Sequence, residues 1–290
     1  MTVAVSNAPS RKLFTRRRLF KAALATFAGA AGAGVYARYI EPRRLSIVQQ
    51  ELTAPAVASA WRGKRIVQLS DLHAGPEVSA THIDRAFRLA LELEPALIVV
   101  TGDWVNHTLS TLPSLLASVR AAAAKTPVYG SLGNHDYGPS WRDMVMADDL
   151  ARALETGGAN VLRNRLAFVG DGLCVAGLED LWSGMMRPAI LDEAPADAWV
   201  IALSHNPDTC LDLLSRRWDV MMSGHTHGGQ VVVPFVGPPI LPIHDRQFAA
   251  GMFRPDPRNG SRVLYVNRGI GHLMKVRFNC TPEITCFTIR

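Results

Sequence analysis

Most side chains that could bind metal ions lie in five short clusters separated by long stretches of chain. The clusters are Asp71-Leu72-His73, Gly102-Asp103, Gly133-Asn134-His135-Asp136, His205 and Gly224-His225-Thr226-His227. They offer carboxylate, amide and imidazole donors but no thiolate. This donor set suits divalent ions such as Mn, Fe or Zn and argues against a closed structural zinc site. The carboxylate of Asp103 has two oxygens and can bridge two ions, so the clusters predict a two-metal hydrolase.

Apolar runs that are typical of buried strands precede these clusters. They cover residues 66–70, 97–101, 128–132, 199–203 and 219–222. In an α/β fold, the ends of parallel strands gather at one edge of a sheet and bring distant segments together. Helices are expected between the strands: one capped by Thr81, then 115–124, 140–155 and 207–216. Further strands are expected at 45–52, 161–169 and 173–176, and the chain from Gln230 onward should be rich in strands.

The order of these motifs resembles the calcineurin-like metallophosphoesterase family from Asp71 to His227. Similarity to its branch of exported bacterial phosphodiesterases continues through Gly228-Gly229-Gln230, Asn267-Arg268-Gly269 and the segment 277–284. The resemblance implies a four-layer α/β/β/α sandwich. It also implies two divalent metal ions (Mn, Zn or Fe) and hydrolysis of a phosphate ester by a hydroxide that bridges them.

The resemblance also assigns roles to individual residues. It implies that the first ion is held by Asp71, His73 and His227. The second ion would be held by Asn134, His205 and His225, and Asp103 would bridge both. His135 is left over from this ligand set, so it is expected to protonate the leaving oxygen, with Asp136 holding its ring. Gly102, Gly133 and Gly224 precede ligand segments, where tight turns favour glycine.

Other polar residues have weaker interpretations. His82 is expected to be solvated in the first turn of a helix. His107, His244 and His272 lie in loops that could face the site or only the solvent. Arg268 could contact phosphate, but an ordinary ion pair is the simpler expectation.

The N-terminus is expected to carry an export signal. Residues 15–21, Thr-Arg-Arg-Arg-Leu-Phe-Lys, resemble the twin-arginine motif, and a mildly apolar run follows to Ala37. Val35-Tyr36-Ala37 fits a cleavage site, and a retained anchor is the alternative. The expected organisation is a signal or anchor at 1–37, a linker with a first strand at 38–60 and the catalytic domain at 61–290. The enzyme would reach the periplasm or the outer face of the membrane or cell wall through the twin-arginine machinery.

The net positive charge of the chain comes from its N-terminus. The formal charge is +6, but residues 1–37 hold six basic and no acidic side chains, so residues 38–290 carry 25 of each sign. A neutral catalytic domain argues against polymeric nucleic acid as a partner. The four cysteines lack metal-finger spacing, which favours buried thiols, although a Cys280–Cys286 bridge stays open.

Three functions remain in competition. The leading one is a metal-dependent phosphoesterase of the cell envelope, expected to be a phosphodiesterase. The second is a pyrophosphate hydrolase acting on a nucleotide-linked lipid such as UDP-diacylglucosamine. The apolar run at residues 231–243 could suit that substrate as a lip over the site, or could be a core strand with a turn. The third is a non-catalytic envelope binding protein, which the intact ligand set disfavours.

Overall fold

Two six-stranded sheets form the centre of the molecule. The structure, a computed structural model, describes residues 16–290. The first sheet has the order β1 (Ser46–Leu52), β12 (Glu283–Ile289), β2 (Arg65–Leu69), β3 (Leu97–Thr101), β4 (Val128–Ser131) and β5 (Ala159–Val161). The second has the order β10 (Gly251–Phe253), β11 (Val263–Val266), β9 (Val220–Ser223), β8 (Trp199–Leu203), β7 (Leu173–Gly177) and β6 (Arg165–Gly170). Strands β2 to β5 are parallel to one another, as are β7, β8, β9 and β11.

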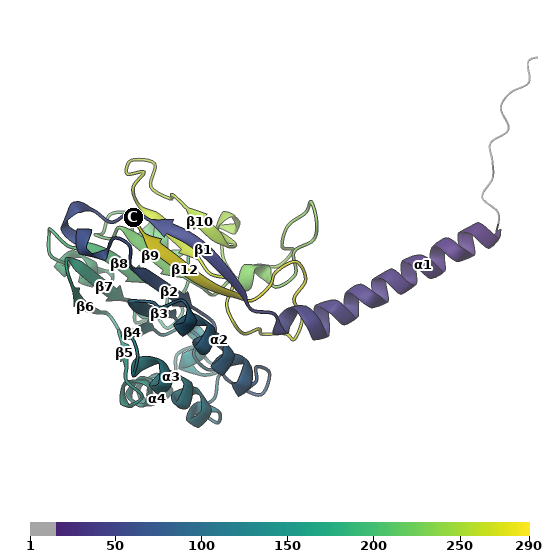
Figure 1. Cartoon of the computed structure of the whole chain (residues 1–290), viewed down its shortest axis with the longest axis horizontal. Helices are drawn as coiled ribbons and strands as arrows, with labels where there is room; N and C mark the ends of the chain where they lie inside the picture. The colour runs from purple at the N-terminus through teal and green to yellow at the C-terminus, as the bar shows by residue number, and fades with distance from the viewer. Residues whose placement is uncertain (1–15) are drawn as a thin grey trace, which may run out of the picture.

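Helices and apolar side chains divide the molecule into layers. Three helices cover the outer face of the first sheet: α2 (Ala80–Glu92), α3 (Leu112–Ala123) and α4 (Met144–Thr156). They lie together on one side of the molecule in Figure 1. Val99, Val175, Ile201 and Met222 belong to the core between the two sheets. Strands alternate inward and outward side chains, so each central strand feeds two cores and is apolar on both faces. This is the four-layer α/β/β/α arrangement predicted from the sequence.

The outer layer of the second sheet is built from short helical segments. These are η5 (Pro188–Glu193), α5 (Thr209–Asp212) and η7 (Arg246–Phe248). The helix expected at 207–216 is therefore wrong beyond its first turn. Trp218 Nε1 donates to the carbonyl of Leu213 at 2.8 Å, and Arg262 Nη2 donates to that of Arg216 at 2.8 Å. The side chains of Trp218 and Arg262 thus bind backbone carbonyls near the end of the predicted helix.

Two other sequence-based boundaries differ from the structure. Helix α2 is capped by Ser79, whose hydroxyl accepts from the amide of His82, and not by Thr81. The strand expected at 161–169 is two strands in different sheets, because the chain crosses between them at Asn164, which has a positive φ of 48°. From Gln230 onward, β10, β11 and β12 are joined by long loops, so this part is less regular than predicted.

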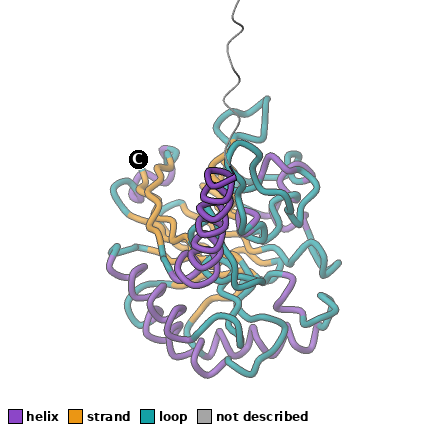
Figure 2. Tube along the Cα trace, turned by 90° about the vertical axis from the view of Figure 1, so that its right-hand side faces the viewer, coloured by secondary structure: helices purple, strands orange, loops and turns teal. Residues whose placement is uncertain are grey.

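The N-terminal helix stands apart from this body. Helix α1 (Arg16–Val35) has no buried residue and projects away from the body in Figure 1. Figure 2 views it nearly end-on, with the strands central and most other helices at the margin. It continues through η1 (Tyr36–Ile40) and η2 (Glu41–Arg43) into β1. Among the described residues, this one helical stretch, Arg16–Arg43, is long and apolar enough to cross a membrane, as signal sequences near an N-terminus also are.

Candidate metal centre

The two sheets meet where their strands deliver the predicted ligands. The buried Gln68 Nε2 at the end of β2 donates to the carbonyl of Ser223 at the end of β9, at 2.9 Å. The ring of His205, just after β8, lies with Nδ1 2.8 Å from the carbonyl of Thr101 at the end of β3. These bonds hold the carboxyl ends of four strands side by side. Segments more than 100 residues apart therefore converge on one buried site.

Asp103 lies at the middle of this site. Its Oδ1 accepts a hydrogen bond from the amide of His135 at 2.9 Å. Its Oδ2 lies 3.4 Å from His73 Nε2 and 3.2 Å from His205 Nε2. His205 Nε2 has no partner with hydrogen-bond geometry, although it is fully buried. One carboxylate oxygen thus faces imidazoles from both sheets, which suits a group shared by two cations.

Asp71, His73 and His227 form a compact group of three donors. Their candidate donor atoms all lie within 4.8 Å of one another. His73 Nε2 is 3.0 Å from His227 Nε2, which in turn is 3.5 Å from Asp71 Oδ1. Burial lowers the pKa of both histidines well below the ordinary value, so both rings are neutral and offer lone pairs. With Nε2 deprotonated on both rings, as metal binding requires, these two atoms beside a carboxylate would suit a divalent cation.

The ligands expected for the second ion are Asn134, His205 and His225; of these, His205 falls with Asp71 and Asp103 in a group whose candidate donor atoms lie within 4.8 Å of one another. Asn134 Oδ1 is buried and has no hydrogen-bond partner. His225 Nε2 lies 3.0 Å from the carbonyl of Pro242. This contact places the ring proton on Nε2 and leaves the lone pair of Nδ1 available to a metal ion. Burial, followed by the charge of His205, lowers the pKa of His225 to about 3. An unsatisfied amide oxygen in a dry site is costly, and an ion bound there would satisfy it.

The backbone is strained at most of these donors. Among the predicted ligands, five have positive φ angles: Asp71 at 50°, His73 at 48°, Asp103 at 51°, His225 at 68° and His227 at 49°. Residues other than glycine seldom adopt this left-handed region, at a cost of about 1–3 kcal/mol each. Such strain persists where the surrounding structure holds it, and it clusters at functional sites.

The glycines that precede the ligands are needed for two different reasons. Gly102 has a φ of 80°, as a tight turn requires. Gly133 and Gly224 have ordinary φ angles, but a Cβ would meet Asp103 at the first and Ser70 and Asp71 at the second. The sequence-based reason of backbone freedom is therefore right for Gly102 only. At the other two positions the carboxylates pack directly against the backbone.

The sequence profile of the calcineurin-like phosphoesterase family matches residues 64–229, which is more than half of the chain and contains every predicted ligand. The chain belongs to the calcineurin-like phosphoesterase family. Members of this family bind a dinuclear divalent metal centre, and the donor groups described above fit one.

Relatives of this phosphoesterase span nearly its whole length. Phosphodiesterase YaeI of Escherichia coli (strain K12) is 33% identical over 279 residues, covering 94% of this chain and 98% of the relative. The uncharacterized metallophosphoesterase YkuE of Bacillus subtilis (strain 168) is 32% identical, with 96% and 99% covered. The UDP-2,3-diacylglucosamine pyrophosphatase LpxG of Chlamydia trachomatis is 27% identical, with 86% and 91% covered. The resemblance to the YaeI and YkuE branch is thus confirmed, and the phosphoesterase is a hydrolase.

His135 lies at the site, but Asp136 does not hold its ring in the structure. The carboxylate of Asp136 accepts from the backbone amides of Val105 at 3.0 Å and Gly133 at 2.9 Å. The ring of His135 instead has Nδ1 2.9 Å from Asn106 Oδ1. Residues 134–137 form one 3-10 turn, which sends neighbouring side chains in different directions. Asp136 therefore fixes the loop, and Asn106 has the position next to the ring that was expected for Asp136.

Other residues also lie at the site; the sequence offered His107 as a candidate, and it assigned no role to the rest. The ring of His107 stacks on that of His135, with 3.8 Å between centroids. Trp182 packs edge-on against His225 at 4.5 Å. Asp180 is almost fully buried, and burial raises its pKa to about 6. The guanidinium of Arg277 is completely buried, with Nη2 3.4 Å from His227 Nδ1.

The remaining polar residues follow the simpler expectations in part. His82 is mostly buried and not solvated, because its Nε2 lies 3.2 Å from the carbonyl of Ile270. Arg268 pairs with Glu283, as expected of an ordinary ion pair. His244 is exposed, whereas His272 is buried beside the base of α1. All four cysteines are buried free thiols, as predicted.

Proposed function

We propose that this phosphoesterase is a metal-dependent phosphodiesterase of the cell envelope. The observation that carries the proposal is the position of Asp103 Oδ2 between His73 and His205. In this assignment the first ion is held by Asp71, His73 and His227, and the second by Asn134, His205 and His225. Asp103 bridges both. The donor types suit Mn, Zn or Fe.

The reaction divides between the ions and the side chains. When bound, two divalent ions supply Lewis acidity and stabilise an activated water for in-line displacement at phosphorus. His135 supplies the proton for the leaving oxygen. Its Nδ1 is oriented by Asn106, which frees Nε2 for the substrate. Burial lowers the pKa of His135, so only the protonated fraction of the ring can act as the acid.

A pyrophosphate hydrolase acting on a nucleotide-linked lipid is the second candidate. Two observations favour it: the similarity to LpxG and an exposed apolar loop shortly after ligand His227. In that loop, Phe235 is fully exposed and Ile240 is 73% exposed. Such side chains could accept acyl chains. The export signal argues against this candidate, because nucleotide-linked lipids are made in the cytoplasm.

An assay of the full chain separates the two candidates. We expect the protein, purified in detergent, to carry two divalent ions per chain by plasma mass spectrometry. It should hydrolyse phosphodiesters faster than phosphomonoesters and faster than UDP-diacylglucosamine. The chelated protein, as control, should be inactive and should recover when Mn or Zn is returned. A clear preference for UDP-diacylglucosamine would replace the leading candidate with the second.

We also propose that residues 1–37 direct export and remain as an anchor before the linker at 38–60 and the domain at 61–290. The motif residues from Arg16 onward lie in α1, whereas Thr15 lies outside the described residues. Ala37, at the expected cleavage site, is buried within continuous helix, and its carbonyl accepts from the amide of Arg277 at 2.9 Å. A buried helical site is a poor protease substrate, which supports retention.

Changing the paired arginines tests this export route. Arg16→Lys with Arg17→Lys should keep the protein in the cytoplasm and leave its specific activity unchanged, since neither residue touches the body. Fractionation and an external protease measure the location. Arg43→Lys with Arg44→Lys makes the same changes at the far end of the helix and should not affect export. Export of the Arg16/Arg17 variant at the normal level would contradict the twin-arginine assignment.

A further inference from the structure

A basic pocket lies where the N-terminal helix meets the body, and the metal centre does not use it. Its volume is about 480 Å³. Its lining includes four basic side chains, Arg38, Arg43, Arg85 and Lys275, and one acidic side chain, Glu77. Lys275 is paired with Glu77 at 2.8 Å. Three arginines are thus left in excess, so the pocket is strongly positive.

Two further features of the pocket favour an anion. The N-terminal end of α2, from Ser79 to His82, contributes to the lining. A helix N-terminus attracts negative charge through its free amides and dipole. His272 is 93% buried and lines the pocket, and neither ring nitrogen has a partner with full hydrogen-bond geometry. A buried ring left without partners is costly, and a bound acceptor would satisfy it.

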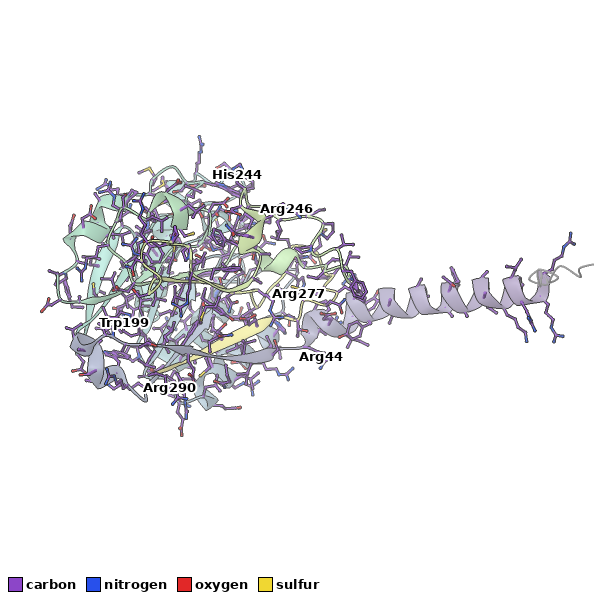
Figure 3. The ribbon with its side chains drawn as sticks, turned by 90° about the horizontal axis from the view of Figure 1, so that it is seen from above. Arg44, Trp199, His244, Arg246, Arg277 and Arg290 are labelled. Atoms are coloured by element: carbon purple, nitrogen blue, oxygen red, sulfur yellow. The ribbon has the colours of Figure 1, made fainter. Side chains whose placement is uncertain are left out.

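The pocket is fixed to both α1 and the metal centre. Arg38 Nη1 donates to the carbonyl of Lys275 at 3.3 Å, and the amide of Arg277 donates to the carbonyl of Ala37 at 2.9 Å. The amide of Gly271, next to His272, donates to the carbonyl of Asp71 at 2.7 Å. Figure 3 shows Arg44 and Arg277 at the end of the body from which α1 departs. The pocket therefore lies between the helix base and the ligand loops.

Exposed apolar side chains surround the same end of the molecule. Met274 is 62% exposed and Val236 is 76% exposed. Gln230 connects their two loops: its Nε2 donates to the carbonyls of Met274 and Val276, and its Oε1 accepts from the amide of Leu273. Helix α1, at 20 residues, is about 30 Å long, which matches the hydrocarbon thickness of a bilayer. Exposed apolar loop residues beside such a helix indicate a surface that contacts lipid.

We propose that this pocket binds the phosphate headgroup of an anionic phospholipid in the bilayer that α1 enters. The arginines and the α2 terminus would hold the phosphate, and His272 would donate a ring N–H to it. The acyl chains would run along α1 and the apolar loops. This contact would hold the catalytic body against the membrane with its metal centre close to the surface. The site is separate from the metal ligands and lies in residues 38 and beyond.

Native mass spectrometry of the full chain in detergent tests the proposal. Short-chain phosphatidylglycerol should bind more tightly than short-chain phosphatidylcholine, and inorganic phosphate should compete only weakly. Arg43→Ala with Arg85→Ala removes two exposed charges and should weaken phosphatidylglycerol binding about 30-fold, at about 1 kcal/mol per charge. His272→Phe should weaken it roughly tenfold. Arg44→Ala with Arg88→Ala is the matched control: it changes the same segments outside the pocket and should bind like the wild type.

Each alternative has its own result. Equal binding by the Arg43/Arg85 variant and the wild type would overturn the proposal. Equal retention of phosphatidylcholine would show that the site recognises acyl chains and not a charged headgroup. Full displacement by inorganic phosphate would make a free anion the ligand. Chelation of metals should leave lipid binding unchanged, and loss of binding on chelation would place the lipid at the metal centre. Because the readout is binding, it is independent of the proposed phosphodiesterase activity.

Discussion

Replacing Asp103 with asparagine is expected to remove more than one metal equivalent per chain and nearly all hydrolysis. Asp103 Oδ1 accepts the amide of His135, so an asparagine would keep its carbonyl oxygen there. Its amino group would then point at His73 and His205, where Oδ2 now lies. The partly positive amino group of the asparagine would then face both ions in place of the negatively charged oxygen that they share. Plasma mass spectrometry and diester hydrolysis measure the two losses.

Two further variants serve as comparisons for the metal content and activity of Asp103→Asn. His73→Ala should mainly empty the first position, because His73 lies with Asp71 and His227. Asp171→Asn should retain both ions and full activity, since Asp171 is an exposed partner of Lys64 and precedes β7, whereas the predicted ligands follow the carboxyl ends of the strands. If Asp103→Asn retains two ions per chain, the bridging assignment is wrong.

Replacing His135 with alanine should separate chemistry from metal binding. A general acid matters most when the leaving group is poor. The variant should therefore keep both ions and lose about 10²–10⁴-fold in rate on alkyl phosphodiesters, with a much smaller loss on activated aryl esters. Rates on the two substrate types, with metal content measured on the same sample, test this expectation.

The structure also supplies a rival role for His135. One group of candidate donors contains His73, Asp103 and His135, so loss of metal in the alanine variant would make it a ligand. Equal losses on both substrate types with metals intact would indicate that it binds phosphate instead. Asn106→Ala should show the same dependence on leaving group with a smaller loss, because it only orients the ring. His244→Ala, on the exposed surface seen in Figure 3, is the matched histidine control.

The ligand-bearing strands could be predicted because their signals are local. The run Leu97–Thr101 is apolar on both faces, and a turn and a carboxylate follow at once. The geometry between segments could not be predicted in this way. Asn106 lies in an irregular loop, and only the folded position of residues 134–137 brings it to His135. Asp136, adjacent in sequence, was the wrong partner because a 3-10 turn directs its carboxylate to backbone amides.

Helix boundaries failed for a related reason. Residues 207–216 have a good N-terminal signal for a helix, but the helix ends at Asp212, and Trp218 and Arg262 donate to the carbonyls of Leu213 and Arg216 that follow it. Arg262 is more than 40 residues away in sequence, so no local pattern reveals its contact. The basic pocket could not be predicted from the sequence either, because its lining comes from the base of α1, the start of α2 and the C-terminal loop. Sequence patterns identify the strands and donor types, whereas contacts distant in sequence decide which side chains meet.

Because β1 pairs with β12, the first sheet cannot be completed before β12 has been synthesised. β1 has β12 as its one sheet neighbour, and β12 also separates β1 from β2. Residues 46–52 therefore cannot join the sheet until residues 283–289 have left the ribosome. Strand pairs so distant in sequence form slowly, because the intervening chain must be closed first. The first sheet is therefore complete only after the rest of the domain has been made, which would suit the export of a folded chain proposed above.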